Sequence, residues 1–195
     1  GKRCTRLNLP EVPSLSMTLD RFHTVTTVDW GAAADSLQLN GRNGSRKEVE
    51  RVFGFLDRLQ PDRPPCRVSS ENNFPTAAGL ASSASAFAAL AMAGAAAAGL
   101  ELDRKKLSVL ARQGSGSACR SLWGGWVHWK MGEREDGEDS HGVPVAPRGH
   151  WDLRMVVAVV SGQKKKVGST EGMIRSRETS PLYKGWASSW GPDIV

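Results

Sequence analysis

The chain has 195 residues, of which 39% are hydrophobic, and its formal net charge at pH 7 is +6. This length and composition predict one globular unit with a hydrophobic core, and they do not fit a membrane protein or a disordered tail. The positive charge suits either nucleic acid or a pocket for a small polyanion, so the placement of the basic residues has to decide between them.

The cysteines indicate the cellular compartment of the protein. Cys4, Cys66 and Cys119 are odd in number and far apart, so they predict neither a disulfide framework nor a zinc site, and we expect a reducing cytoplasmic setting. The uncharged stretch from Ala77 to Leu100 is mostly Ala, Gly and Ser, which predicts a buried helix rather than a membrane span. The chain begins without Met or a signal peptide, so we expect it to be a fragment.

The first third of the chain predicts strands followed by a helix. Residues 14–30 alternate apolar and polar side chains around a polar break at Asp20 and Arg21, which predicts an antiparallel pair of strands. Residues 36–45 add a short strand and a turn. Residues 45–59 have the three-and-four spacing of an amphipathic helix. Its predicted apolar face consists of Val49, Val52, Phe53, Leu56 and Leu59.

The middle of the chain predicts a strand and two helices that each adjoin a Gly/Ser turn. Residues 66–72 predict a strand that leads through a polar loop into the alanine-rich helix. Residues 103–121 predict a shorter helix that runs into a second Gly/Ser turn.

The last third predicts two more strands and a helix. Residues 122–132 alternate apolar and polar side chains, which predicts a strand, and residues 133–144 are predicted to form a charged loop. The apolar run at 152–161 predicts a central strand. A further helix is expected after Gly168, with Ser169 or Thr170 as its cap. The order of these elements predicts a two-layer α+β architecture.

Three turns carry hydroxyl groups beside glycine. In the first, Gly79, Ser82 and Ser83 precede the alanine-rich run, where a helix N-terminus can bind an anion, although a serine cap without a ligand is equally compatible. In the second, "GSGSACR" at residues 114–120, Ser115 and Ser117 offer hydroxyls and Arg120 adds a planar fork suited to phosphate or carboxylate.

The third turn, "KKKVGSTEGM", combines three lysines with another hydroxyl-rich helix start, although a solvated loop is the simpler interpretation of the lysines. No Walker-type motif or Gly-x-Ser-x-Gly elbow occurs in the sequence. The four histidines are isolated, so we expect them to be structural or surface residues rather than metal ligands.

Several segments together resemble a known family. "NNFPTAAGLASSASAFAAL", "RQGSGSACRSLWGGWVHW", "GKRCTRLNLPEVPSLSMTL" and "STEGM...ETSPLYKGW" resemble the diphosphomevalonate decarboxylases of the GHMP kinase superfamily. The resemblance implies that residues 1–195 form one GHMP-kinase-type amino-terminal domain with a two-layer, ribosomal-protein-like α+β fold. It also implies that the first strand and the carboxy-terminal domain of the family are missing.

The family resemblance implies an activity as well. Such enzymes use ATP and Mg²⁺ to phosphorylate the tertiary hydroxyl of mevalonate 5-diphosphate, and loss of phosphate and carbon dioxide then gives isopentenyl diphosphate. The implied setting is the cytoplasm, with no nucleic-acid or membrane partner and with a homodimer when the protein is full length.

The resemblance also implies site residues. The implied ATP-binding residues are Asn73, Pro75, Gly79, Leu80, Ala81, Ser82 and Ser83. The implied substrate-binding residues are Gly1, Lys2, Asn8, Arg51, Ser115, Gly116, Ser117, Ala118, Cys119, Arg120, Ser169 and Thr170. Arg120 and Ser83 are the implied catalytic residues, with Ser83 also near Mg²⁺. The family's catalytic aspartate would follow Val195, so we expect the chain alone to bind substrate poorly and to turn over little or nothing.

Two alternatives remain at this stage. Another GHMP-type small-molecule kinase would keep the fold and ATP but change the acceptor, and the arginine of the second turn argues against it. A non-catalytic RNA-binding fragment would use the positive charge for phosphate backbone, with strongly salt-dependent affinity.

Overall fold

The structure is a computed structural model that describes residues 1–74, 82–158 and 167–189. Its α-helices are α1 (Arg46–Leu59), α2 (Ser82–Ala97), α3 (Arg104–Gly114), α4 (Ser169–Thr179) and α5 (Tyr183–Ser189). Its strands are β1 (Lys2–Cys4), β2 (Leu9–Pro10), β3 (Ser14–Met17), β4 (Thr24–Trp30), β5 (Ser36–Leu39), β6 (Arg42–Asn43), β7 (Cys66–Asn72), β8 (Trp126–Trp129) and β9 (Gly142–Ala146). Two 3-10 helices, η1 (Gly116–Arg120) and η2 (Arg148–His150), are also present. Among these helices, none has the length and apolar character needed to cross a bilayer.

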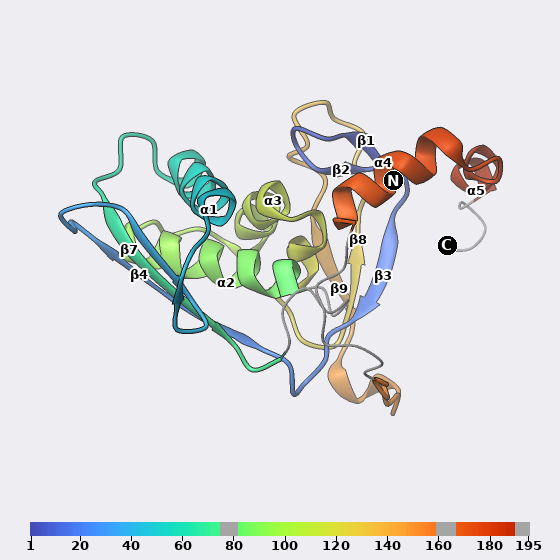
Figure 1. Cartoon of the computed structure of the whole chain (residues 1–195). Coiled ribbons are helices and arrows are strands. Elements are labelled where there is room, and N and C mark those ends of the chain that lie inside the picture. The colour runs from blue at the N-terminus through green and yellow to red at the C-terminus, as the bar shows by residue number, and fades with distance from the viewer. Residues whose placement is uncertain (75–81, 159–166, 190–195) are drawn as a thin grey trace.

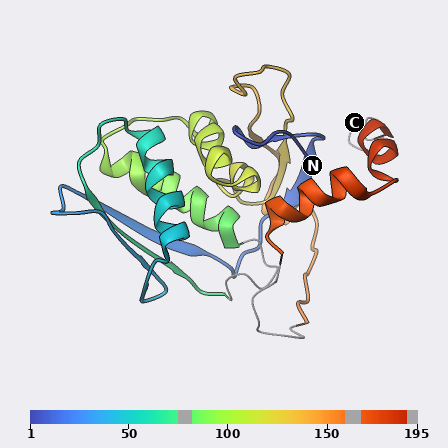
Figure 2. The same cartoon turned by 45° about the horizontal axis from the view of Figure 1, so that its top comes forward.

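The larger sheet has four strands in the order β4-β7-β5-β6. β4 pairs with β7 in antiparallel register through Val28 and Val68, and β5 pairs with β7 in parallel through Leu37 and Val68. α1, α2 and α3 lie on one face of this sheet (Figures 1 and 2). This arrangement confirms the two-layer α+β expectation.

The second sheet has three strands in the order β3-β8-β9, and β1 and β2 form a separate hairpin. β3 and β4 are the two strands predicted from residues 14–30, but the prediction that they pair with each other is wrong. The alternation of apolar and polar residues shows only that one face of a strand is buried, and it does not identify the strand's partner. The residues around Asp20 connect one sheet to the other.

Helix packing explains the alanine-rich sequence of α2. Ala88, Ala91 and Ala95 are buried in the core together with Phe53 and Leu56 of α1. A Cβ on Gly94 would lie 3.0 Å from a methyl group of Leu56, so small side chains on α2 allow α1 to approach closely. The predicted apolar face of α1 is confirmed, because Phe53, Leu56 and Leu59 are buried and Val49 and Val52 pack against the same core.

The start of α1 is fixed by a charged network. The Ser45 amide donates to Glu48 Oε2 at 2.8 Å, and Arg42 forms an ion pair with the same carboxylate at 2.7 Å. The Arg42 guanidinium is the main cause that lowers the pKa of Glu48 to about 2, and bonds from Ser45 assist it.

Replacing Glu48 by glutamine is expected to destabilise the fold by about 1 kcal/mol at pH 7, because the carboxylate is part of a helix cap and is partly solvent-screened. The folded-state pKa lies below the ordinary value of 4.5, so the wild-type advantage is present above pH 4.5 and decreases as the pH falls toward 2. Urea unfolding at pH 7 and pH 3 measures it. A difference between variant and wild type that stays constant with pH would contradict this assignment.

Two expectations for residues 133–161 are wrong. The charged loop ends earlier than predicted, because residues 142–146 form strand β9 against β8. The predicted central strand is not a strand over its described part, residues 152–158, and Val156 is 92% exposed. No strand edge in the described chain pairs with this segment, and β-structure requires such a partner. The rest of that prediction, residues 159–161, lies outside the described residues.

The helix expected after Gly168 is present as α4, but its cap differs from the prediction. Gly168 is the N-cap, with φ −69° and ψ 153°, and Ser169 is already the first helical residue. By contrast, the predicted helix in residues 103–121 is confirmed as α3, whose cap Asp103 accepts a bond from the Lys106 amide.

Candidate functional site

The first two hydroxyl-rich turns meet in space. Ser83, at the start of α2, and Ser115, at the end of α3, have their hydroxyl oxygens 3.2 Å apart. A Cβ on Gly114 would lie 2.0 Å from a ring carbon of Phe87, so glycine is required where α3 meets α2. The end of α3 is therefore packed directly against the first turns of α2, and the two serines face each other.

Much of the predicted ATP-binding loop is not described. Pro75, Gly79, Leu80 and Ala81 lie outside the described residues. Ser82 begins α2 beside Ser83.

Asn73, the remaining predicted ATP-binding residue, is occupied by structural bonds. Its amide nitrogen donates to the Arg21 carbonyl at 2.6 Å, and its amide oxygen accepts from the His23 amide at 2.9 Å. Asn73 thus fixes the chain at the beginning of β4.

The second turn separates buried from accessible side chains. Ala118 and Cys119 are fully buried, and burial raises the pKa of the Cys119 thiol to about 12. These two predicted substrate-binding residues therefore anchor the turn in the core. Gly116 lies against the Trp129 ring, where a Cβ would come within 2.9 Å of a ring carbon. Ser117 belongs to the same 3-10 turn and is only partly buried.

Arg120 is held from two sides. Its Nη1 donates to Ser14 Oγ at 2.6 Å, and its guanidinium carbon lies 5.3 Å from the centre of the Trp129 ring. Ser14 and Trp129 are directly opposite each other on β3 and β8. Burial lowers the pKa of Arg120, which means that its charge is partly desolvated.

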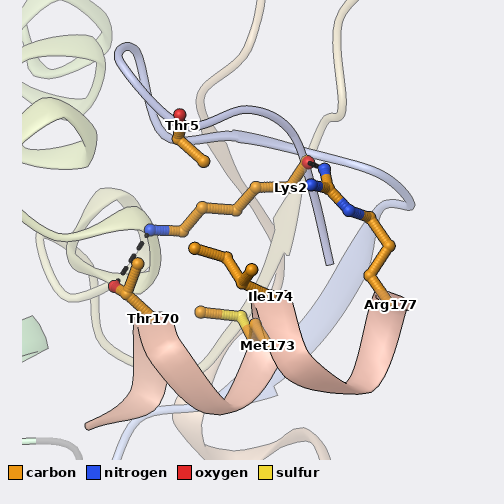
Figure 3. Close-up of a pocket in the computed structure, with 6 residues that line it drawn as sticks. All are labelled: Lys2, Thr5, Thr170, Met173, Ile174 and Arg177. Atoms are coloured by element: carbon orange, nitrogen blue, oxygen red, sulfur yellow. Dashed lines mark hydrogen bonds between the residues drawn. The ribbon is translucent and has the colours of Figure 1, made fainter. Parts of the chain in front are cut away.

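The amino-terminal segment lies beside the end of α3. Lys2 Nζ donates to Asn8 Oδ1 at 2.5 Å. It also donates to Thr170 Oγ1 of α4 at 3.4 Å (Figure 3). Asn8 adopts φ 53°, a left-handed conformation that asparagine tolerates, and its Nδ2 donates to the Arg112 and Gln113 carbonyls. Thus one lysine connects the first strand, the end of α3 and the start of α4.

Figure 3 shows the small pocket between the amino terminus and α4. Met173 and Ile174 of α4 lie along the Lys2 side chain, and Arg177 donates to the Lys2 carbonyl at 3.2 Å. Gly1 accepts a backbone bond from Glu11 and does not line either pocket described here. Ser169 precedes Thr170 in the first turn of α4 and is exposed.

A basic cleft of about 380 Å³ lies next to this pocket. Its lining residues are Lys2, Thr5, Arg6, Asn8, Glu50, Arg51, Gly54, Phe55, Arg58, Gln113, Gly114 and Thr170. Four of these residues are cationic and one is anionic. The cleft therefore has the charge and the hydrogen-bond donors to hold a phosphorylated anion.

Arg51 and Lys2 are the predicted cations in this cleft. Arg51 Nη2 donates to the Gly114 carbonyl at 2.8 Å, and its guanidinium carbon lies 4.6 Å from the centre of the Phe87 ring. The pKa of Lys2 is lowered first by burial and then by the charge of Arg51. Two cations that repel each other across a cleft favour an anion between them.

The structure thus brings together most of the predicted residues that it describes, in two adjacent groups. Lys2, Asn8, Arg51 and Thr170 line the basic cleft, whereas Arg120 lies on η1, the turn that follows Gly114 and Ser115. The predicted lysine cluster at 164–166 lies outside the described residues.

Sequence reasoning missed Arg6, Arg58, Ser14 and Trp129. Arg58 follows Arg51 by two helical turns and could have been found on the same face of α1. Ser14 and Trp129 could not have been found from motifs, because their place beside Arg120 depends on the pairing of two distant strands.

Comparisons with known proteins place this chain in a family. Residues 1–142 match the family model described as the diphosphomevalonate decarboxylase-like N-terminal domain. The chain belongs to this family. Residues 155–192 match a second model, described as the mevalonate 5-diphosphate decarboxylase C-terminal domain. The family resemblance expected from the sequence motifs is thereby confirmed.

Similar proteins and a similar solved structure support this family membership. A diphosphomevalonate decarboxylase of Aspergillus fumigatus is 47% identical, over 99% of this chain and 53% of that protein, and one of Homo sapiens is 46% identical over 98% and 52%. A solved structure described as MDDEF in complex with MVAPP, AMPPCP and magnesium superposes with a TM-score of 0.85 at 40% identity, over 100% of this chain and 61% of that one. This family member spans about half the length of its curated relatives.

Proposed function

We propose that the protein takes part in the ATP-dependent decarboxylation of mevalonate 5-diphosphate to isopentenyl diphosphate, with ADP, phosphate and carbon dioxide as the other products. The observation that carries the proposal is the 3.2 Å contact between Ser83 and Ser115. It unites the helix start suited to nucleotide phosphates with the turn that carries Arg120, so two anionic reactants would be held side by side.

The basic cleft is the proposed place of the substrate diphosphate. Lys2, Arg51 and Arg58 supply charge, while Asn8 and Thr170 supply polar groups that keep Lys2 in place. Burial and, secondly, repulsion by Arg51 lower the pKa of Lys2, and a bound diphosphate would offset both. The similar structure described as a complex with MVAPP supports the choice of ligand.

Arg120 is proposed to hold the substrate carboxylate. One of its nitrogens bonds to Ser14, and the others make no bond to any residue in the described chain, so part of the guanidinium fork is available. A guanidinium pairs well with a planar carboxylate and can orient it for departure as carbon dioxide. The turn would also exclude water from the carboxylate site, because Ala118 and Cys119 on its core-facing side are fully buried.

The start of α2 fits the triphosphate of ATP. α2 has 16 residues, and its first turn bears two serines and no acidic residue, so its N-terminus favours phosphate groups. Within the described residues, no group of three or more His, Cys, Asp or Glu could hold a metal, which suits an ion held mainly by ATP with the Ser83 hydroxyl nearby. ATP with Mg²⁺ would supply the phosphoryl group that converts the tertiary hydroxyl into a leaving group.

Two further properties are part of the proposal. The three cysteines are free thiols, which supports a reducing, cytoplasmic location. We also propose a homodimer for the full-length protein, and light scattering of that protein is the measurement.

Binding and product analysis test the proposed function. Isothermal titration with mevalonate 5-diphosphate is expected to show weak but saturable binding, and added salt should weaken it further. Mevalonate, which lacks the diphosphate, is expected to bind at least about a hundredfold more weakly. Any turnover with carboxyl-labelled substrate, ATP and Mg²⁺ should release ADP and carbon dioxide in equal amounts. ADP without carbon dioxide would instead favour a small-molecule kinase, and absence of diphosphate-dependent binding would contradict the proposal.

A further inference from the structure

Ser108 of α3 is a buried hydroxyl that connects two segments distant from it. It is 0% exposed. Its Oγ donates to the Cys119 carbonyl at 2.8 Å and accepts from the Gly142 amide of β9 at 2.8 Å. Since Cys119 directly precedes Arg120, Ser108 fixes the backbone of the turn from which the Arg120 side chain extends.

Ser140 plays a similar part beneath the Arg120 side chain. It too is 0% exposed. Its Oγ accepts from Trp129 Nε1 at 3.2 Å and donates to the Lys130 carbonyl at 3.0 Å. Because the guanidinium of Arg120 lies over the Trp129 ring, Ser140 fixes the surface on which that guanidinium rests.

The two hydroxyls act on one row of residues. Ser14, Trp129 and Gly142 are cross-strand partners on β3, β8 and β9. Arg120 contacts the first two members of this row, and Ser108 bonds to the third.

The packing around this row is tight. A Cβ on Gly142 would lie 2.5 Å from the Cys119 carbonyl oxygen, and a Cβ on Gly116 would lie 2.9 Å from the Trp129 ring. There is no room for the turn to shift toward β8 or β9. The orientation of Arg120 therefore depends on hydrogen bonds in a dry environment, where a lost bond is not replaced by water.

We propose that Ser108 and Ser140 are positioning residues that orient the Arg120 guanidinium for the substrate carboxylate. The proposal rests on the proposed function of Arg120. Neither serine contacts substrate; each acts through Arg120, Ser108 by the turn and Ser140 by the indole ring.

A double-mutant cycle separates this role from general stability. Ser108→Ala is expected to weaken binding of mevalonate 5-diphosphate by about tenfold in the wild-type chain but by less than about twofold in the Arg120→Ala background. Ser108→Thr, which keeps a hydroxyl, should recover part of the affinity. Ser70→Ala is the matched control, because Ser70 is also a buried serine, 7% exposed and bonded to Thr26, and it should leave affinity unchanged. Equal losses in both backgrounds would overturn the proposal.

A ligand-free measurement keeps this proposal distinct from the proposed function. If wild-type chain does not bind mevalonate 5-diphosphate, the proposed function fails, and the NMR signals of the Arg120 Nε–H and Trp129 Nε1–H groups still test the positioning. Ser108→Ala should shift and broaden the Arg120 signal, Ser140→Ala should shift the Trp129 signal, and Ser70→Ala should move neither. Unchanged Arg120 and Trp129 signals in the first two variants would overturn the proposal.

Discussion

Replacement of Arg120 by alanine is expected to weaken binding of mevalonate 5-diphosphate by roughly a hundredfold, or about 2.7 kcal/mol. The guanidinium is already partly desolvated by burial, which lowers its pKa, and it is held in place by Ser14 and Trp129. Little further desolvation or ordering is therefore required when a carboxylate binds, so most of the charge-assisted interaction contributes to affinity.

Two controls locate the effect. Arg120→Lys keeps the charge but loses the planar fork, so an intermediate affinity is expected. Inorganic diphosphate should bind the wild type and Arg120→Ala equally, because Arg120 does not line the basic cleft. Calorimetry measures the wild type and both variants with both ligands. Unchanged affinity of Arg120→Ala for mevalonate 5-diphosphate would show that Arg120 does not hold the carboxylate.

Replacement of Arg63 by methionine is expected to destabilise the fold by about 2 kcal/mol, since water partly screens its two carboxylate partners. The Arg63 side chain is only 6% exposed and forms ion pairs at 2.8 Å with both Asp35 and Asp57. Its guanidinium carbon also lies 5.1 Å from the centre of the Phe53 ring. Loss of the arginine leaves Asp35 without its main partner next to the buried start of β7, where Asp35 also accepts from the Cys66 amide.

The ion pair also gives this variant a pH signature. Hydrogen bonding to Arg63 is the main cause that lowers the pKa of Asp35 below its ordinary value of 3.8. The wild-type advantage is therefore present above that value and decreases as the pH falls through the folded-state pKa. Urea unfolding at pH 7 and pH 3 should show a smaller difference between wild type and variant at the lower pH.

Arg46 offers a matched control for Arg63. It also pairs with a carboxylate, Glu50, at 2.8 Å, but its side chain is 93% exposed. Arg46→Met is expected to change the free energy of unfolding by less than about 0.5 kcal/mol. If Arg63→Met were as mild as Arg46→Met, the ion pairs of Arg63 would not be a main stabilising contact between α1, β5 and β7.

Local patterns in the sequence predicted the helices well and the strand partners poorly. α1 was predicted from its apolar spacing, and in the structure Ser45 and Asp103 cap α1 and α3; all these signals act within a few residues. The partner of β3 is β8, more than a hundred residues away, and no local sequence pattern predicts this pairing. Residues 152–158 fail for the same reason: their apolar run predicts a strand, but a strand has to pair with another strand, and no strand of the described chain pairs with them.

The candidate site shows the same division. Ser83 and Ser115 were predicted from the hydroxyl-rich turns, because the chemistry of anion binding limits the residue types that can serve. Lys2 was predicted only from the family resemblance. Arg6 was missed, because a cation on an exposed segment is indistinguishable from a solvated one until the fold forms a cleft around it. Arg58 was missed although it lies on the same face of α1 as Arg51. Ser108 and Ser140 were missed because their proposed role depends on complete burial, and burial is known only once the chain is packed.

The central claim is that the two hydroxyl-rich turns and the amino-terminal segment form one site for a phosphorylated substrate. The most direct measurement is a ¹⁵N–¹H NMR titration of the chain with mevalonate 5-diphosphate. The account predicts concerted shifts, with one binding constant, at Lys2, Asn8, Ser115 and Arg120. Saturating ligand that leaves either the Lys2–Asn8 segment or the turn at residues 115–120 unmoved would contradict it.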